Sequence, residues 1–172
     1  GLLGTADFAE LGSRLAFLMD GPALGIGDPN VVVALLAIMM VLVGIAFKLS
    51  LVPFHFWCPD AFEGAPAEVA GYLSVASKAA SFALLVRFLL VFATGGESLQ
   101  TLNLFLGLSL GAVAAVSMTF GNLAAYTQTN VKRLLAYSTI AHAGYMLLAV
   151  AAMLVIINAQ PTDGWTLQRV YV

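Results

Sequence analysis

The chain has 172 residues, of which 61% are hydrophobic and only 9% are charged, and its formal net charge at pH 7 is −2. Soluble domains carry about 25% charged residues and place polar stripes on their helices, so this composition disfavours a soluble all-α bundle. There is no basic patch to bind nucleic acid, and the single cysteine, Cys58, can form no internal disulfide.

The apolar residues are grouped in blocks long enough to cross a bilayer, which takes roughly 20 residues of helix. We therefore predict an all-α fold: a polytopic transmembrane helix bundle of about four spanning helices, one of them broken at Val52-Pro53. The mean hydropathy of +0.97 agrees with an integral, multi-pass membrane protein that has the lipid bilayer as a partner.

Residues 1–30 mix charged side chains with glycine and proline, which is typical of an interfacial loop, and a short helix is possible at residues 8–18. Asp28 and Asn30 can cap free backbone N–H groups, so they mark the start of the first span, at residues 31–51. Because the chain opens with Gly1 and its first apolar stretch is too short to span, we expect it to begin inside a longer protein.

The stretch that follows the first span is irregular. Pro53, Pro59 and Pro66 each remove a backbone donor and bias the preceding residue away from helix. We expect a break there, followed by a short helical piece at residues 54–62. Non-helical backbone at membrane depth is tolerated only where protein or a water-filled cavity satisfies its polar groups.

Three further spans are expected at residues 66–93, 102–126 and 134–158, followed by a polar, interfacial tail at residues 159–172. Lys132 and Arg133 lie together in the connector before the last span, which favours the cytoplasmic side for that end of the bundle. Glycines in the spans are expected to let helices approach closely: Gly44, Gly71, Gly107, Gly111, Gly121 and Gly144.

Three ionisable residues lie inside the expected spans: Lys48, Lys78 and His142. Such residues are costly in a membrane and are functional candidates by default. Lys48 and Lys78 are nearly equally far along the chain from the apex of the hairpin that joins their spans. At about 1.5 Å per residue, Lys78 lies roughly 18 Å below the start of its helix and His142 roughly 15 Å below Lys132. We therefore expect all three in one layer near the bilayer centre.

Desolvation and a nearby like charge both lower the pKa of a lysine, so a buried lysine can exchange protons near neutral pH, where histidine already titrates. Such a row, joined by waters and hydroxyl groups, could relay protons between two half-channels. The competing interpretations are that His142 only packs between helices and that Lys48 partly snorkels to the surface.

The broken segment carries His55, Cys58, Asp60 and Glu63, which are residue types that bind metal ions. We reject a metal site because the ligand types are mixed and no second pair supports a tetrahedral arrangement. Asp60 and Glu63 are expected instead to pin the broken segment through hydrogen bonds.

Two long stretches carry a resemblance: "FKLSLVPFHFWCPDAFEGAPAEVAGYLSVASKAASF" and "GNLAAYTQTNVKRLLAYSTIAHAGYMLL". Residues 31–155 resemble the antiporter-like membrane subunits of proton-pumping NADH:quinone oxidoreductase (respiratory complex I), most closely the group called subunit N or subunit 2. The whole antiporter-like group shares a P-x-H-x-W-x-P-D-A core, which here comprises Pro53, His55, Trp57, Pro59, Asp60 and Ala61. The flanking "FKLS", "EGAP" and "SK" favour subunit N over its relatives.

The resemblance implies that residues 31–158 form an antiporter-like transmembrane segment whose discontinuous helix lies beside an ion pathway. It implies that Lys48 is the switch of a half-channel and that Lys78 passes the proton along a central axis, whereas His142 stands where relatives have histidine or glutamine. The glutamate that pairs with the switch lysine in this family is not in the chain.

The function implied is that of a proton-translocating membrane subunit of NADH:quinone oxidoreductase, which is an enzyme subunit that does no redox chemistry itself. No cofactor is expected in this chain, because NADH and quinone would be used by other subunits of the complex. Its partners would be neighbouring membrane subunits of complex I and protons, with no nucleic acid. The membrane would be a bacterial plasma membrane or that of an energy-converting organelle.

Two alternatives stay open. The chain could belong to a multisubunit cation/proton antiporter that has no redox coupling, although the flanking motifs argue against it. It could also be a scaffold subunit whose lysines form structural ion pairs only.

Overall fold

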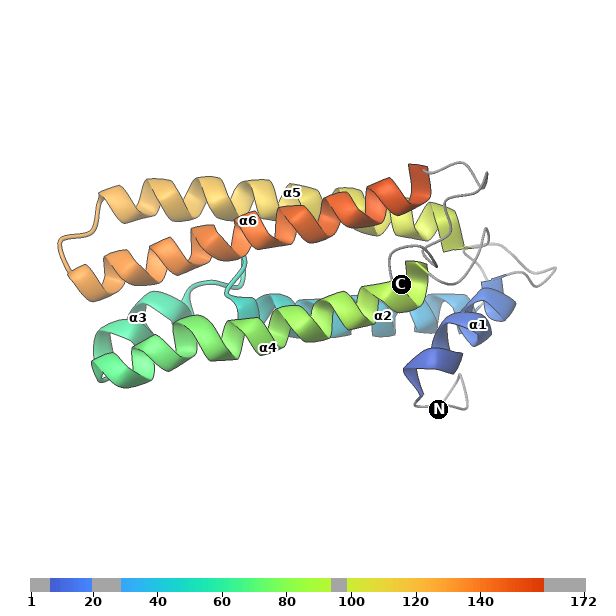
Figure 1. Cartoon of the computed structure of the whole chain (residues 1–172), viewed down its shortest axis with the longest axis horizontal. Helices are drawn as coiled ribbons and strands as arrows, with labels where there is room; N and C mark the ends of the chain where they lie inside the picture. Colours follow the sequence, from blue (N-terminus) through green and yellow to red (C-terminus); the bar gives the residue numbers. More distant parts are fainter. Residues whose placement is uncertain (1–6, 20–28, 94–98, 160–172) are drawn as a thin grey trace, which may run out of the picture.

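The computed structural model describes residues 7–19, 29–93 and 99–159, and within these ranges all regular structure is helical (Figure 1). The helices in chain order are α1 (Phe8–Met19), α2 (Pro29–Leu49), α3 (Trp57–Gly64), α4 (Ala67–Ala93), α5 (Gln100–Tyr126) and α6 (Val131–Ala159). Of these, α2, α4, α5 and α6 are long and apolar enough to cross a membrane. The predicted all-α fold, with four spans and a broken helix, is confirmed.

The four long helices lie roughly parallel to one axis (Figure 1). Helices α5 and α6 form an antiparallel hairpin, and α4 runs beside α6 with α2 against it. The short helix α3 lies at the end of the bundle where α5 turns into α6. Helix α1 lies at the opposite end, in contact with α4 and α2. The residues of the break between α2 and α3 therefore face α5 and α6.

The helix boundaries differ from the expected ones by up to three residues, and two of the differences have a clear cause in the structure. Helix α6 begins at Val131, before the expected residue 134, because Asn130 caps it: its Oδ1 accepts the backbone N–H of Lys132 at 3.0 Å. Helix α3 ends at Gly64, beyond the expected residue 62, since the next residue, Ala65, is the one held extended before Pro66. The expected tail lies outside the described residues, apart from the end of α6, and so does half of the expected loop at residues 1–30.

Buried apolar side chains form two clusters. The larger one joins α2, α4, α5 and α6 and includes Leu49, Leu85 and Leu147. The smaller one packs α3 against α6 and α4, with Cys58 and Phe62 meeting Ala136 and Ile140. Burial of apolar side chains against α6 therefore fixes one face of α3.

Glycines bring α5 and α6 into backbone contact. A Cβ atom on Gly121 would lie 2.8 Å from the backbone N of Ala141, and one on Gly144 would lie 2.8 Å from the N of Met118. Gly107 is also close to α6, but its near neighbour is the side chain of Val155, whereas Gly44 and Gly71 meet nothing within 4 Å among the described residues. Close helix approach is therefore seen at Gly107, Gly121 and Gly144, and within the described residues it is not seen at Gly44, Gly71 or Gly111.

Candidate functional site

The broken segment begins where α2 ends in a Schellman motif. The backbone N–H of Leu51 donates to the carbonyl of Ala46 at 2.9 Å, and the N–H of Ser50 donates to that of Phe47 at 3.0 Å. Ser50 has a φ of 59°, the left-handed conformation that this motif needs and that glycine usually supplies. The helix thus stops inside the bundle with its last carbonyl groups partly satisfied by its own chain.

Two side chains from outside α2 form hydrogen bonds with backbone groups of the break. The indole Nε1 of Trp57 donates to the carbonyl of Phe47 at 3.0 Å, and the two rings stack with centroids 5.7 Å apart. The hydroxyl of Ser117, fully buried in α5, accepts the backbone N–H of Val52 at 3.0 Å. Since unsatisfied backbone costs several kcal/mol in a bilayer, these contacts make the break tolerable.

Polar contacts at the end of the bundle hold α3 against α6. Arg133 Nη1 lies 2.9 Å from Glu63 Oε2 and 3.3 Å from Asp60 Oδ1. Asn130 Nδ2 donates to Glu63 Oε1 at 2.9 Å, and Lys132 Nζ donates to the carbonyl of Ala65 at 2.9 Å. Asp60 and Glu63 therefore lie at the bundle end that carries Lys132 and Arg133.

The ammonium group of Lys78 is buried between α4 and α6, with 4% of the residue exposed. Its Nζ donates to the carbonyl and to the hydroxyl of Thr139, each at 3.0 Å. The thiol of Cys58, on α3, lies 4.0 Å from the same hydroxyl. No aspartate or glutamate in the described part of the chain forms an ion pair with Lys78, so neutral oxygens alone hold this charge.

Lys48 has a different environment. It lies in the last turn of α2, where the negative end of the helix dipole favours a cation, and it is exposed. Within the ranges that the structure describes, its ammonium group has no hydrogen-bond or ion-pair partner. The structure therefore does not bring Lys48 into contact with the Lys78 site.

The two histidines lie apart from each other. His142 is exposed on α6, and its ring meets that of Tyr145 edge-on with centroids 6.1 Å apart. Because Thr139 precedes it by less than one turn, His142 is close in depth to Lys78. His55 is buried in the break between the rings of Phe56 and Phe120, whose centroids lie 4.3 and 4.6 Å from its own.

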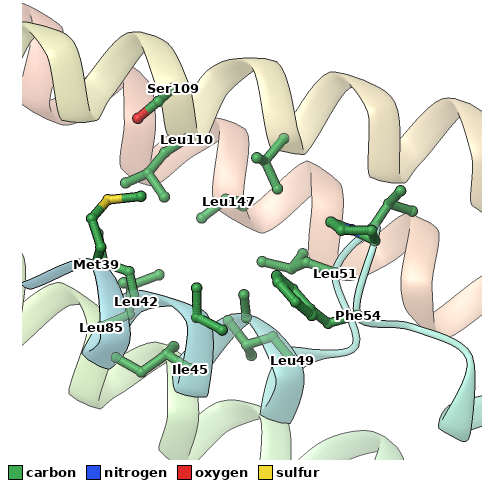
Figure 2. A pocket seen from close by; sticks show the side chains of 15 residues that line it. Met39, Leu42, Ile45, Leu49, Leu51, Phe54, Leu85, Ser109, Leu110 and Leu147 are labelled. Carbon is green, nitrogen blue, oxygen red and sulfur yellow. The ribbon is translucent and has the colours of Figure 1, made fainter. Parts of the chain in front are cut away.

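Two cavities of unlike character flank the break. One of about 280 Å³ lies between α2, α5 and the break, and its lining is apolar apart from Ser109 (Figure 2). The other, of about 260 Å³, runs between α4 and α6 from Lys132 past Ser74 and Ser138 to Thr139. Apolar cavities stay dry, whereas the lining of the second cavity includes the hydroxyl residues Ser74, Ser138 and Thr139, which can bind water.

No group of three or more histidine, cysteine, aspartate or glutamate side chains in the described ranges could hold a metal ion. The carboxylates of Asp60 and Glu63 contact Arg133, and His55 lies among aromatic rings. The sequence predicts that hydroxyl groups accompany the lysines, but it does not indicate that Thr139 binds Lys78 or that Ser117 binds the break. The only available signal was a small hydroxyl residue inside an apolar span.

The chain matches the family model described as "NADH:quinone oxidoreductase/Mrp antiporter, TM" over residues 1–161. It is 45% identical over 159 residues to NADH-quinone oxidoreductase subunit N of Anaeromyxobacter sp. (strain Fw109-5), covering 89% of this chain and 30% of that protein. It is 53% identical over 152 residues to NADH-quinone oxidoreductase subunit N 2 of Solibacter usitatus (strain Ellin6076), covering 88% and 28%.

A solved structure is similar as well: a chain of respiratory complex I from Thermus thermophilus with bound aureothin. The TM-score is 0.55 and the sequence identity 38%, over 88% of this chain and 34% of that one. The chain therefore spans about a third or less of the length of these relatives.

Proposed function

This chain belongs to the NADH:quinone oxidoreductase/Mrp antiporter transmembrane family, and on that premise we propose that it is a proton-translocating membrane segment of an NADH:quinone oxidoreductase. The relatives named subunit N, at 45% and 53% identity, support this assignment. The chain is a multi-pass integral membrane segment.

The observation that carries the proposal is the buried ammonium group of Lys78, held by two neutral oxygens in a spanning helix. A charge in such a place is costly, and a structural charge would be paired with an opposite one. A group that must gain and lose a proton is instead better served by neutral partners, because an ion pair would lock it in the charged form.

In this proposal, protons enter through the cavity between α4 and α6. Water that enters this cavity would extend from Lys132, at the bundle end, to Thr139, which touches Lys78. From there the proton would pass along the layer in which His142 lies, while Lys48 at the α2 break would serve as the switch. The exposed faces of Lys48 and His142 are where further helices of a complete subunit would continue the path.

The redox chemistry belongs, in this proposal, to other subunits of the complex, which use NADH and quinone. The partners of this chain would be neighbouring antiporter-like membrane subunits, and the coupling would be conformational and electrostatic. The alternative is a cation/proton antiporter subunit without redox coupling, since the family description includes antiporters. Sodium-dependent proton movement without quinone reduction would favour that alternative.

The test replaces Lys78 by alanine in the complete subunit, assembled with its complex in sealed vesicles, and measures quinone reduction and proton uptake together. We expect the rates of quinone reduction and of proton uptake to fall sharply while the complex remains assembled. Lys78→Arg should have the same effect, because arginine keeps the charge but does not release a proton.

The matched control is Arg87→Ala, which removes an exposed basic residue from the same helix and should leave both rates unchanged. Parental rates in Lys78→Ala would contradict the proposal and favour a scaffold role. Full activity in Lys78→Arg would show that only the charge matters, which would also contradict a proton-transfer role.

A further inference from the structure

The two oxygens that hold Lys78 belong to one residue, but they differ in chemistry. The carbonyl of Thr139 can only accept hydrogen bonds, whereas its hydroxyl can accept or donate. In the structure the hydroxyl accepts from Lys78 Nζ at 3.0 Å and lies 2.8 Å from the carbonyl of Ala136, to which it donates. Of the two oxygens, only the hydroxyl can therefore change from accepting a hydrogen bond to donating one.

We propose that Thr139 is a positioning residue that holds the Lys78 amine in both charge states by reversing the hydrogen bond of its hydroxyl. This inference rests on the proposed function, because it requires Lys78 to lose and regain a proton. In the charged state, the ammonium donates to the carbonyl and the hydroxyl of Thr139, as the structure shows.

When the ammonium gives one proton to a water molecule, the neutral amine keeps two N–H groups and gains a lone pair. One N–H still donates to the Thr139 carbonyl. The hydroxyl proton turns about the Cβ–Oγ1 bond, away from Ala136, and donates to the lone pair. The carbonyl of Ala136 retains its ordinary helical hydrogen bond, so neither that carbonyl nor the Thr139 hydroxyl is left unpaired in either state.

Other partners would not serve both states equally well. Two carbonyl groups would leave the lone pair of the neutral amine facing an acceptor, and a carboxylate would hold the amine in its charged form. The buried Cys58 thiol, 4.0 Å from the hydroxyl, adds only a weak third neighbour. A single hydroxyl residue on α6 thus permits proton exchange without movement of heavy atoms.

The test compares Thr139→Val and Thr139→Ser in the complete subunit, assembled in its complex in sealed vesicles. Valine has nearly the shape of threonine but no hydroxyl, and serine keeps the hydroxyl. We expect proton uptake to fall about tenfold in Thr139→Val, as the loss of a hydrogen bond to a charged group predicts, and to recover in Thr139→Ser. In a Lys78→Ala background, Thr139→Val should have no further effect.

Thr119→Val is the matched control, because Thr119 makes the same kind of bond, to the carbonyl of Ala115 at 2.8 Å, but holds no lysine. It should leave uptake unchanged. Parental uptake in Thr139→Val, with collapse in Lys78→Ala, would overturn this inference and leave the proposed function standing. Parental uptake in Lys78→Ala would overturn both.

Equal losses in the valine and serine variants would assign Thr139 a packing role and would also overturn the inference. Thr139→Ala is the second variant, in case valine prevents assembly. It should behave as valine does, with serine alone restoring uptake. Failure of both valine and alanine variants to assemble, while serine assembles normally, would make the residue structural and would overturn the inference as well.

Discussion

At the scale of single residues, the carbonyl group of Phe47 is the centre of the helix break. It accepts the N–H of Ser50 from its own chain and the indole N–H of Trp57 from the next helix, each at 3.0 Å. The Schellman motif that provides the first bond places Ser50 in the left-handed conformation, which costs roughly 1–2 kcal/mol for an L-residue. The Ser117 bond offsets that cost by satisfying the N–H of Val52, and the tryptophan bond gives the Phe47 carbonyl a second donor.

The tryptophan can be tested by a change that keeps its ring stacking. Trp57→Phe retains an aromatic ring beside Phe47 but removes the N–H donor. Because one hydrogen bond is lost while the Phe47 carbonyl keeps its other donor, we expect a loss of about 1 kcal/mol in stability. The measurement is the fraction of complex that remains assembled after heating, compared with the parent.

The control for this change is Phe56→Leu, which alters a neighbouring aromatic residue whose side chain is exposed. It should leave thermal assembly unchanged. If Trp57→Phe is as stable as the parent, the indole N–H contributes nothing and the stacked rings alone hold α3 to the end of α2.

At the scale of helices, α3 is held at its two sides by different forces. Its apolar face packs on α6 through Cys58 and Phe62, while its acidic side chains pair with Arg133. The two carboxylates are not equivalent. Glu63 lies 2.9 Å from Arg133 and also accepts from Asn130, whereas Asp60 lies 3.3 Å away with its side chain 74% exposed. Glu63 should therefore hold the helix more firmly than Asp60.

This ranking predicts different hydrogen-exchange behaviour for two alanine variants. Glu63→Ala should speed amide exchange in residues 57–64, because it removes both the arginine and the asparagine contacts. Asp60→Ala should have a smaller effect, since exposed ion pairs contribute little. Glu68→Ala, an exposed acidic residue in the first turn of α4, is the control and should leave exchange unchanged. Equal effects of the Asp60 and Glu63 variants would refute the ranking.

The α5–α6 hairpin depends on glycine where the two backbones touch. A methyl group at Gly144 would lie 2.8 Å from the N of Met118 and 2.9 Å from the carbonyl O of Ala114, and neither backbone atom can move aside alone. We expect Gly144→Ala to destabilise the hairpin by about 1–3 kcal/mol, as overpacking does. Gly71→Ala, on α4, is the matched control and should be tolerated, because nothing lies within 4 Å of its added carbon. Thermal assembly of both variants measures the difference, and similar losses would contradict it.

At the scale of the whole molecule, the features that could be predicted from sequence are those that depend on neighbours along the chain. Runs of apolar residues predicted the four spans, and closely spaced prolines predicted the break before Pro53. The burial of Lys78 followed from its distance to the nearest polar connector, and the structure leaves only 4% of it exposed. Each of these properties is local, so one sequence suffices to predict it.

The partners of these residues could not be predicted, because they depend on how each helix is rotated about its axis. The spans are apolar nearly all round, so the sequence does not indicate which face meets which neighbour. Nothing in it placed Thr139 at Lys78 or Ser117 at Val52. The same uncertainty explains why Lys48 and His142, expected in one layer with Lys78, lie exposed while Lys78 is buried.

The orientation of the bundle in the membrane can be determined by labelling cysteines placed near the two ends of α5. Glu63 contacts Arg133, so the α2–α4 hairpin and the α5–α6 turn share one end of the bundle, for which the Lys132-Arg133 pair predicts the cytoplasmic side. We therefore expect Thr129→Cys to react with an impermeant maleimide from the cytoplasmic side and Thr101→Cys from the opposite side, since both positions are exposed. Cys58 is buried and should stay unlabelled. The reverse pattern would invert the orientation but leave the fold intact, whereas labelling of both positions from one side would mean that α5 does not cross the membrane.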